Sequence, residues 1–397
     1  MWVPATTDEL EAAVRQRSVV ETATLDFKAA LPLAAKNHDL AVDVGAMTTE
    51  GGVLIYGVGE DEQEQPTVFA PIELAGARER VAQIAQSSIM PPPHIDIRAL
   101  AASEDPARGY LVVAIPRSAV APHMVITGNE YRYYGRNAAG NRILTEGEVA
   151  LLYQRRDRWQ LDRDQHLAEV VSDAMFPPSD KLIYAHAFVR PVATDDELVV
   201  RAARGADVRG LLHEAREHAG QFAAADRYTP DLRNASSIRR RGADGWLLHD
   251  GLHRREEAIP DEVVYARLDR DGTMRFFCGR VGDRNSSGYR LIFEGSIAGN
   301  TSVAFAIAGL VYERAGFVGE VDVGIAVTNL AGAISERVHR DGVWAGDGFG
   351  NEDYRRTGRI LAGRLATDPR QVVSELCLQL FEITLPPGAD AFDTTKR

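Results

Sequence analysis

One apolar run, VLIYGV at residues 53–58, most constrains how the N-terminal part of this chain folds. It follows the glycine pair Gly51-Gly52 and carries no charge, which indicates a buried strand. Around it, the residue pattern predicts further strands over 22–28, 94–100, 110–116 and 131–136, and helices over 6–17, 36–48, 74–88 and 145–156. We therefore expect residues up to about 156 to form one compact α/β unit.

The length of 397 residues predicts two domains, at roughly 100–200 residues per domain. A charged stretch over 155–164 (RRDRWQLDRD) marks the expected boundary, so we place the domains at 1–158 and 159–397. The second domain shows an α+β pattern, with strands over 181–190, 244–249, 262–269, 274–280, 289–295 and 320–327, and helices over 207–224, 301–315 and 369–380. Asp271-Gly272 predicts a hairpin turn, the apolar run 302–317 a buried core helix, and the polar tail after about 387 a disordered end. The predicted fold class is mixed: an α/β domain followed by an α+β domain.

Composition excludes several classes of protein. Hydrophobic residues make up 45% and charged residues 26%, close to an average soluble globular protein. No window approaches the ~18 apolar residues of a membrane span, and the first residues lack the pattern of a secretory signal. Two cysteines cannot form a disulfide framework or a four-thiolate zinc site. We therefore expect a cytoplasmic protein without a membrane partner.

Acidic residues cluster around two of the predicted strands. Glu21 and Asp26 flank the strand 22–28, and Glu60 and Asp61 follow VLIYGV, so neighbouring strands would bring these carboxylates to one end of a sheet. Such clusters bind Mg²⁺ or Mn²⁺, which prefer oxygen ligands and can stabilise charge on a phosphodiester. Because positions 21 and 26 are an odd number apart, a straight strand would point them to opposite faces, so a bend near Glu21 is needed. From residue types alone, solvated surface acids remain the alternative.

A series of short motifs in residues 18–156 resembles the Schlafen AlbA_2 domain, also labelled a divergent AAA-4 or DNA-binding domain. The family pattern contains a Glu, a Glu/Asp-Phe-Lys strand, a helix ending in a phrase like Phe-Ala-Asn-Thr-x-Gly-Gly, an apolar strand, Gly-Val-x-Asp, a proline-rich segment, a strand ending in Val-Pro-x-Ser and a Tyr-x-Arg strand. These appear here in order as Glu21, Leu25-Asp26-Phe27-Lys28, Thr48-Thr49-Glu50-Gly51-Gly52, Gly57-Val58-Gly59-Glu60-Asp61, Pro91-Pro92-Pro93, Ile115-Pro116-Arg117-Ser118 and Tyr133-Tyr134-Gly135-Arg136. Thr48 stands here where the family has Asn. The resemblance implies a bacterial Schlafen-like protein and covers about 35% of the chain.

The resemblance also implies an activity and a set of site residues. Nucleolytic members of the family resemble metal-dependent endoribonucleases that cut transfer or ribosomal RNA. Their three acidic positions fall here on Glu21, Asp26 and Glu60, with Asp61 as a substitute for Glu60. Asp replaces the family's Glu at 26 and Glu replaces its Asp at 60, and both remain oxygen ligands for Mg²⁺ or Mn²⁺. Lys28 would contact the scissile phosphate as a point charge, or alternatively would simply point outward from an edge strand.

A basic and aromatic segment follows the acidic one. Arginine neutralises phosphates and tyrosine stacks on unpaired bases, and in TGNEYRYYGRN the strand alternation places Arg132, Tyr134 and Arg136 on one face. We expect these residues, with Arg117, to bind nucleic acid, against the alternative of an ordinary solvated strand face. The net charge of −12 argues against a protein that coats nucleic acid nonspecifically, but it allows a local basic surface.

Two hypotheses for function result. The first is a Schlafen-like endoribonuclease that cleaves structured RNA, such as tRNA, with Mg²⁺ or Mn²⁺, in stress or antiviral (antiphage) defence. The second is a non-catalytic nucleic-acid-binding or regulatory protein, in which the basic strand binds RNA or another nucleic acid. The second domain carries no recognisable motif, and by position it could sense a trigger, bind a partner or form a homo-oligomer. A P-loop ATPase is unsupported because the sequence contains no GxxxxGK[ST] motif.

Overall fold

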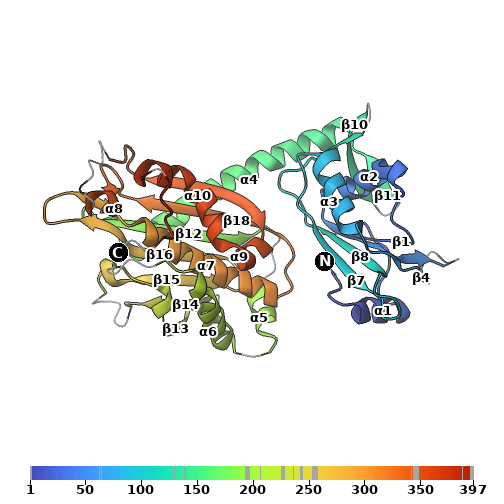
Figure 1. The fold of residues 1–397 in the computed structure, drawn as a ribbon, viewed down its shortest axis with the longest axis horizontal. Helices are drawn as coiled ribbons and strands as arrows, with labels where there is room; N and C mark the ends of the chain where they lie inside the picture. The colour runs from blue at the N-terminus through green and yellow to red at the C-terminus, as the bar shows by residue number, and fades with distance from the viewer. Residues whose placement is uncertain are drawn as a thin grey trace. The chain divides into compact units, whose positions relative to one another are not determined.

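The structure, a computed structural model, describes residues 2–61, 63, 65–127, 130–137, 140–192, 197–205, 207–224, 229–235, 237–241, 245–252, 258–340, 342, 348–386 and 388–393. The chain divides into two compact units, unit 1 at Met1–Gln160 and unit 2 at Leu161–Arg397 (Figure 1). Each unit combines helices with sheets, so the expected mixed class is confirmed.

In unit 1, short strands alternate with helices along the chain. The helices are α1 (Thr7–Arg15), η1 (Ala34–Lys36), α2 (Asn37–Met47), α3 (Ala77–Ser88) and the first part of α4 (Glu146–Ser172). The strands are β1 (Leu25–Lys28), β2 (Gly52–Tyr56), β3 (Val58–Glu60), β4 (Pro66–Phe69), β5 (Ile72–Glu73), β6 (Ile89–Met90), β7 (Asp96–Ala101), β8 (Arg108–Ile115), β9 (Met124–Thr127), β10 (Glu130–Asn137) and β11 (Gly140–Ile143).

The expected buried strand is β2, which lies inside a five-stranded sheet. The strand order is β1-β2-β8-β5, with β7 also paired to β8, and β1 runs parallel to β2 while β8 runs antiparallel to it. Val53 and Ile55 pack with α1 on one face of the sheet, whereas Leu54 and Tyr56 pack with α2 and α3 on the other. Since both faces are covered, the strand is apolar at every position, as its sequence indicated. A second sheet, β11-β10-β9-β6, packs against α2.

Unit 2 is built on one large sheet. Its helices are α5 (Leu198–Ala203), α6 (Val208–Ala219), η2 (Gly220–Phe222), η3 (Leu232–Asn234), η4 (Pro260–Glu262), α7 (Glu294–Arg314), α8 (Glu336–Arg340), α9 (Gly363–Thr367) and α10 (Pro369–Thr384). Its strands are β12 (Leu182–Pro191), β13 (Ser237–Arg241), β14 (Gly245–Asp250), β15 (Val264–Asp269), β16 (Met274–Arg284), β17 (Arg290–Ile292), β18 (Glu320–Thr328), β19 (Ile334–Ser335) and β20 (Tyr354–Leu361).

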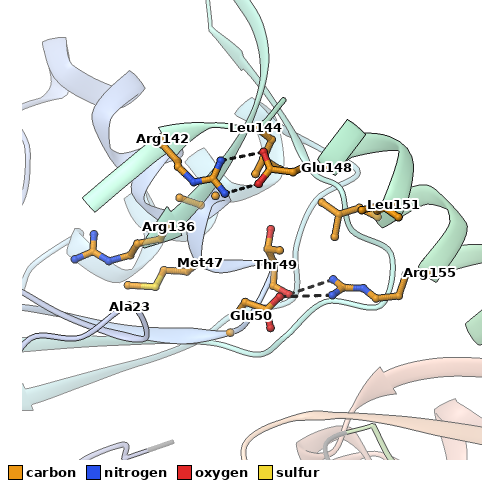
Figure 2. A pocket seen from close by; sticks show the side chains of 14 residues that line it. Ala23, Met47, Thr49, Glu50, Arg136, Arg142, Leu144, Glu148, Leu151 and Arg155 are labelled. Atoms are coloured by element: carbon orange, nitrogen blue, oxygen red, sulfur yellow. Dashed lines mark hydrogen bonds and ion pairs between the residues drawn. The ribbon is translucent and has the colours of Figure 1, made fainter. Parts of the chain in front are cut away.

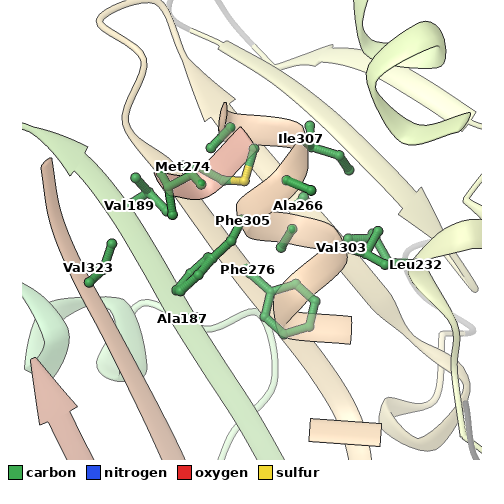
Figure 3. Packing of buried hydrophobic residues seen from close by; sticks show 14 of the residues in the cluster. Ala187, Val189, Leu232, Ala266, Met274, Phe276, Val303, Phe305, Ile307 and Val323 are labelled. Carbon is green, nitrogen blue, oxygen red and sulfur yellow. The ribbon is translucent and has the colours of Figure 1, made fainter. Parts of the chain in front are cut away.

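The core of unit 2 lies between this sheet and α7. The strands follow the order β13-β14-β15-β16-β12-β18-β20, all antiparallel, and β17 joins β16 to β19. Phe305 of α7 lies near Ala187 of β12 and Val323 of β18 in this core (Figure 3). By length and composition α7 could cross a membrane, but 94% of its apolar window is buried inside the unit. This burial confirms the expected core helix.

Three expectations about element boundaries differ from the structure. The helix expected to end at 156 continues through the charged stretch to Ser172. The arginine, glutamine and leucine residues of this stretch favour helix, and a helix needs apolar residues only at intervals along its sequence to pack on one face. The division between the units therefore falls inside α4. Helix α7 begins at Glu294 rather than at 301, with its small and polar first turns buried. In the tail, Ala391 is buried against Ala298, so the expected disorder is wrong for 388–393, while 387 and 394–397 lie outside the described residues.

Candidate active site

Glu21 lies in a turn before β1 rather than in the strand itself. A bridge between Thr22 and Leu25 closes the turn, and the Glu21 carboxylate folds back so that Oε1 accepts the backbone N–H of Phe27 at 2.7 Å. This is the bend that the sequence argument required. Its consequence is that Glu21 and Asp26 can meet although they are an odd number of positions apart.

Asp26 is fully buried and is held by two cationic side chains. Lys28 Nζ lies 3.0 Å from Oδ2 and donates to Oδ1 at 3.1 Å, and Arg136 Nη2 lies 2.8 Å from Oδ1. Asp26 pairs with Leu54 in the parallel β1–β2 ladder. The two cations arrive from different elements, Lys28 from β1 and Arg136 from β10, so Asp26 ties the two sheets of unit 1 together.

The carboxyl groups of Glu21 and Asp26, hereafter the acid pair, lie within hydrogen-bonding reach of each other. Burial raises the pKa of Glu21 to about 7, the contact with Asp26 and the charge of Glu60 add to the rise, and the Phe27 N–H opposes it. Two facing carboxyl groups repel unless a proton or a cation lies between them. The acid pair is therefore a place where a positive charge is stabilised.

Asp43 of α2 is a further acid at this site, and the sequence argument missed it. It is 9% exposed, its Oδ1 accepts from Asn141 Nδ2 at 2.6 Å, and burial first, then the charge of Asp26, raise its pKa to about 6, with Lys28 opposing the rise. The available signal was a lone acid within the buried helical run LAVDVGAM. Together with Asn141 of β11, it extends the polar network from β1 to the second sheet.

The two acids after VLIYGV have different surroundings. Asp61 closes its own turn, since Oδ1 accepts from the N–H groups of Gln63 and Gln65 and Oδ2 from the Thr67 hydroxyl, so its carboxylate is structurally engaged. These backbone hydrogen bonds lower the pKa of Asp61. Glu60 is exposed at the end of β3 and acts on Glu21 through its charge. Among the described residues, no group of three or more His, Cys, Asp or Glu is arranged to hold a metal ion, so the expected three-acid set is not preformed.

The expected nucleic-acid-binding residues do not share one exposed face. Arg136 has only 9% of its side chain exposed because it reaches inward to Asp26, and Tyr134 is half-buried against α2, with its ring edge-on to His38. Strand alternation gave their common face correctly, but α2 covers that face. Arg132 is 47% exposed beside Glu130, at the open end of β10.

Arg117 lies at a separate, exposed position. Its side chain is 44% exposed, 3.6 Å from Glu50, and its guanidinium lies 5.8 Å from the centre of the Trp159 ring. Arg155 uses the same two partners, at 3.6 Å from Glu50 and 5.0 Å from the Trp159 ring. Two guanidinium groups thus share one carboxylate, which leaves this surface net positive.

No family model matches the chain, and no curated protein matches it.

Proposed function

We propose that unit 1 is a Schlafen AlbA_2-like domain that hydrolyses phosphodiester bonds in structured RNA, such as tRNA, with Mg²⁺ or Mn²⁺. The observation that carries this proposal is the acid pair, two contacting carboxyl groups on β1 and the turn before it, with a third acid, Glu60, in electrostatic range. The order of the short motifs in residues 18–156 supports the same assignment.

The acid pair suits a hard divalent cation. Mg²⁺ is usually bound by one or two carboxylates together with water and substrate phosphates, so a complete cage of protein ligands is not required. Asp26 Oδ2 is buried and lies 3.0 Å from Lys28 Nζ, so a cation bound there would share this oxygen with the Lys28 ammonium group. Glu21 and Asp26 would hold the ion, and Glu60 would add negative charge at the rim. A bound ion would supply an activated water and stabilisation of the charge on the phosphodiester.

The remaining polar residues orient the acids and balance their charge. Arg136 and Lys28 fix the Asp26 carboxylate, so its direction toward Glu21 is set before any ligand arrives. The Lys28 side chain is 39% exposed, and its ammonium group can therefore also approach a bound phosphate. Asn141 holds Asp43 in place behind them.

One observation favours the second hypothesis, a nucleic-acid-binding protein without catalysis. Two cations already neutralise Asp26, so the acid pair is stable as a purely structural element when Glu21 is protonated. In that case Arg132 and the Arg117–Arg155 surface would bind RNA by phosphate contacts alone.

Cleavage of RNA by the full-length chain distinguishes the two hypotheses. We expect the wild-type protein to cleave tRNA, to lose activity with a chelator and to regain it with Mn²⁺ or Mg²⁺. Glu21→Gln keeps the shape of the side chain and removes the charge that holds the ion, so it should abolish cleavage. Glu79→Gln, on the exposed side of α3, is the matched control and should cleave normally. RNA binding without cleavage in every metal would support the second hypothesis instead.

Within this proposal, unit 2 controls the nuclease by sensing a trigger, binding a partner or forming a homo-oligomer. The protein would act in the cytoplasm, in stress or antiviral defence.

A further inference from the structure

A pocket of about 310 Å³ opens in unit 1 (Figure 2). Its floor is apolar and comes from Met47 at the end of α2, Leu144 after β11, and Leu152 of α4. Its volume lies at the lower end of the range for small-molecule sites, about 300–1,000 Å³. The pocket therefore has room for one small group that contacts apolar side chains.

The pocket and the acid pair share one side chain. Arg136 is one of the residues that line the pocket, and its guanidinium, which points away from Glu148 and Leu151 in Figure 2, lies 2.8 Å from Asp26 Oδ1. Ala23, in the turn that carries Glu21, also lines the pocket mouth. One lining residue thus contacts Asp26, and another lies two positions after Glu21.

The charges at the pocket rim are paired, which bears on the chemistry of the ligand. Arg142 makes a bidentate ion pair with Glu148, with nitrogen–oxygen distances of 2.9 and 2.5 Å (Figure 2). Arg155 donates a hydrogen bond to the Thr49 carbonyl at 3.1 Å and lies 3.6 Å from the Glu50 carboxylate. A bare phosphate in the pocket would meet two carboxylates. A neutral ring with polar edges would instead find apolar walls below and both donors and acceptors at the rim.

Leu151 adds an exposed apolar surface at the mouth. Its side chain is 65% exposed although it lines the pocket, and in Figure 2 it lies between the two ion pairs. Proteins that extract bases from a stack commonly use such an apolar side chain as a wedge or a stacking surface.

We propose that this pocket receives one unpaired base of the RNA substrate and so places the adjoining phosphate at the acid pair. The inference rests on the proposed function, which it deepens by naming how the substrate is positioned. Specific recognition of RNA commonly uses splayed, unstacked bases, whereas the surrounding backbone is held by cationic side chains. Here Arg117 and Arg155, which share Glu50, lie on the same side of unit 1 as the pocket rim and would contact the flanking backbone.

The test uses the full-length protein with chelator present, so that no cleavage takes place. Met47 lines the pocket floor and is one of six methionines, so its methyl resonance in a methionine-labelled sample reports directly on the pocket. We expect adenosine 5′-monophosphate and an adenosine pentanucleotide to shift the Met47 resonance in a saturable way, because a base ring would lie against it. Ribose 5-phosphate, which lacks the base, should leave it unshifted.

Two variants make the test specific. Ala23→Leu fills the pocket mouth from an exposed position and should abolish the Met47 shift, whereas Ala107→Leu, at an exposed position in the turn before β8, should preserve it. The resonances of Met90 and Met124, which also lie in unit 1, show whether each variant is folded. Leu151→Ala, also exposed, should weaken the nucleotide affinity severalfold.

Three results would overturn the inference. The first is a Met47 shift with ribose 5-phosphate equal to that with adenosine 5′-monophosphate, which would make the pocket an anion site. The others are no Met47 shift with either base-containing ligand up to its solubility limit, and an unchanged Met47 shift in Ala23→Leu. These outcomes are separate from the cleavage assay. RNA cleavage by wild-type protein together with an unresponsive Met47 refutes the base pocket alone. A responsive Met47 without any cleavage refutes the nuclease and leaves the pocket as a binding site.

Discussion

Replacing Arg136 by methionine should destabilise unit 1 much more than the same change at Arg132. Both arginines lie on β10, but Arg136 has 9% of its side chain exposed and is paired with the fully buried Asp26, while Arg132 is 47% exposed. Removing one partner of a buried ion pair costs about 3–5 kcal/mol, because it leaves a buried charge uncompensated. Since Lys28 remains beside Asp26, we expect the lower end, about 3 kcal/mol, for Arg136→Met. Arg132→Met should change stability by about 0.5 kcal/mol or less.

Native-state hydrogen exchange of the amides in β1 and β2 measures this difference within unit 1. A loss of about 3 kcal/mol corresponds to exchange about a hundredfold faster at these strands, at a factor of ten for each ~1.4 kcal/mol. Adding Asp26→Asn to Arg136→Met removes the buried charge that has lost its partner, and it should restore part of the protection of these amides from exchange. Exchange in Arg136→Met as slow as in Arg132→Met, or no recovery in the double variant, would show that Arg136 does not stabilise the buried Asp26 carboxylate.

Three further predictions concern stability, thiol reactivity and RNA binding. Burial raises the pKa of Glu294 to about 7, so the stability that its protonated form contributes is full below the unfolded pKa and is lost as pH rises through about 7. The Glu294→Gln variant should have wild-type stability near pH 5 and be about 1–3 kcal/mol more stable than the wild type at pH 8. Paired thermal melts of the two proteins check this. Burial raises the pKa of the Cys278 thiol to about 12 and also raises the pKa of the Cys377 thiol. Neither thiol should therefore react with a thiol reagent until denaturant is added, and rapid labelling of the native protein would contradict this prediction. Arg132→Ala should lower the magnitude of the salt slope of RNA binding by about one, and a wild-type slope would exclude a phosphate contact there.

The acid pair shows how far residue patterns can locate a site. The motif order placed Glu21 and Asp26 together, and the odd spacing required a bend that the turn between Thr22 and Leu25 provides. Spacing could not show that Asp26 would be fully buried with two cations, because Arg136 arrives from a strand more than a hundred positions away. It also could not separate Glu60 from Asp61, whose carboxylate is used by local N–H groups.

Tertiary packing explains the expectations that differ from the structure. Alternation along β10 predicted the common face of Tyr134 and Arg136, but only the packing of α2 decides that this face is covered. Asp43 was hidden by the same packing, since an acid in a helix is usually solvated. In α4, a run of charges looked like a linker because composition does not show that a helix can pass from one unit to the next.

Binding of Mn²⁺ to the acid pair is the decisive test of the proposed nuclease site. A crystal of the full-length protein grown with Mn²⁺, measured for anomalous scattering, would locate the ion without assuming its ligands. The proposed function predicts a peak about 2.0–2.6 Å from a carboxylate oxygen of Glu21 and from one of Asp26, and no such peak in Glu21→Gln. A wild-type map with no peak there at saturating Mn²⁺, and with the two carboxyl groups still in contact, would contradict the claim that this site is a metal-dependent nuclease.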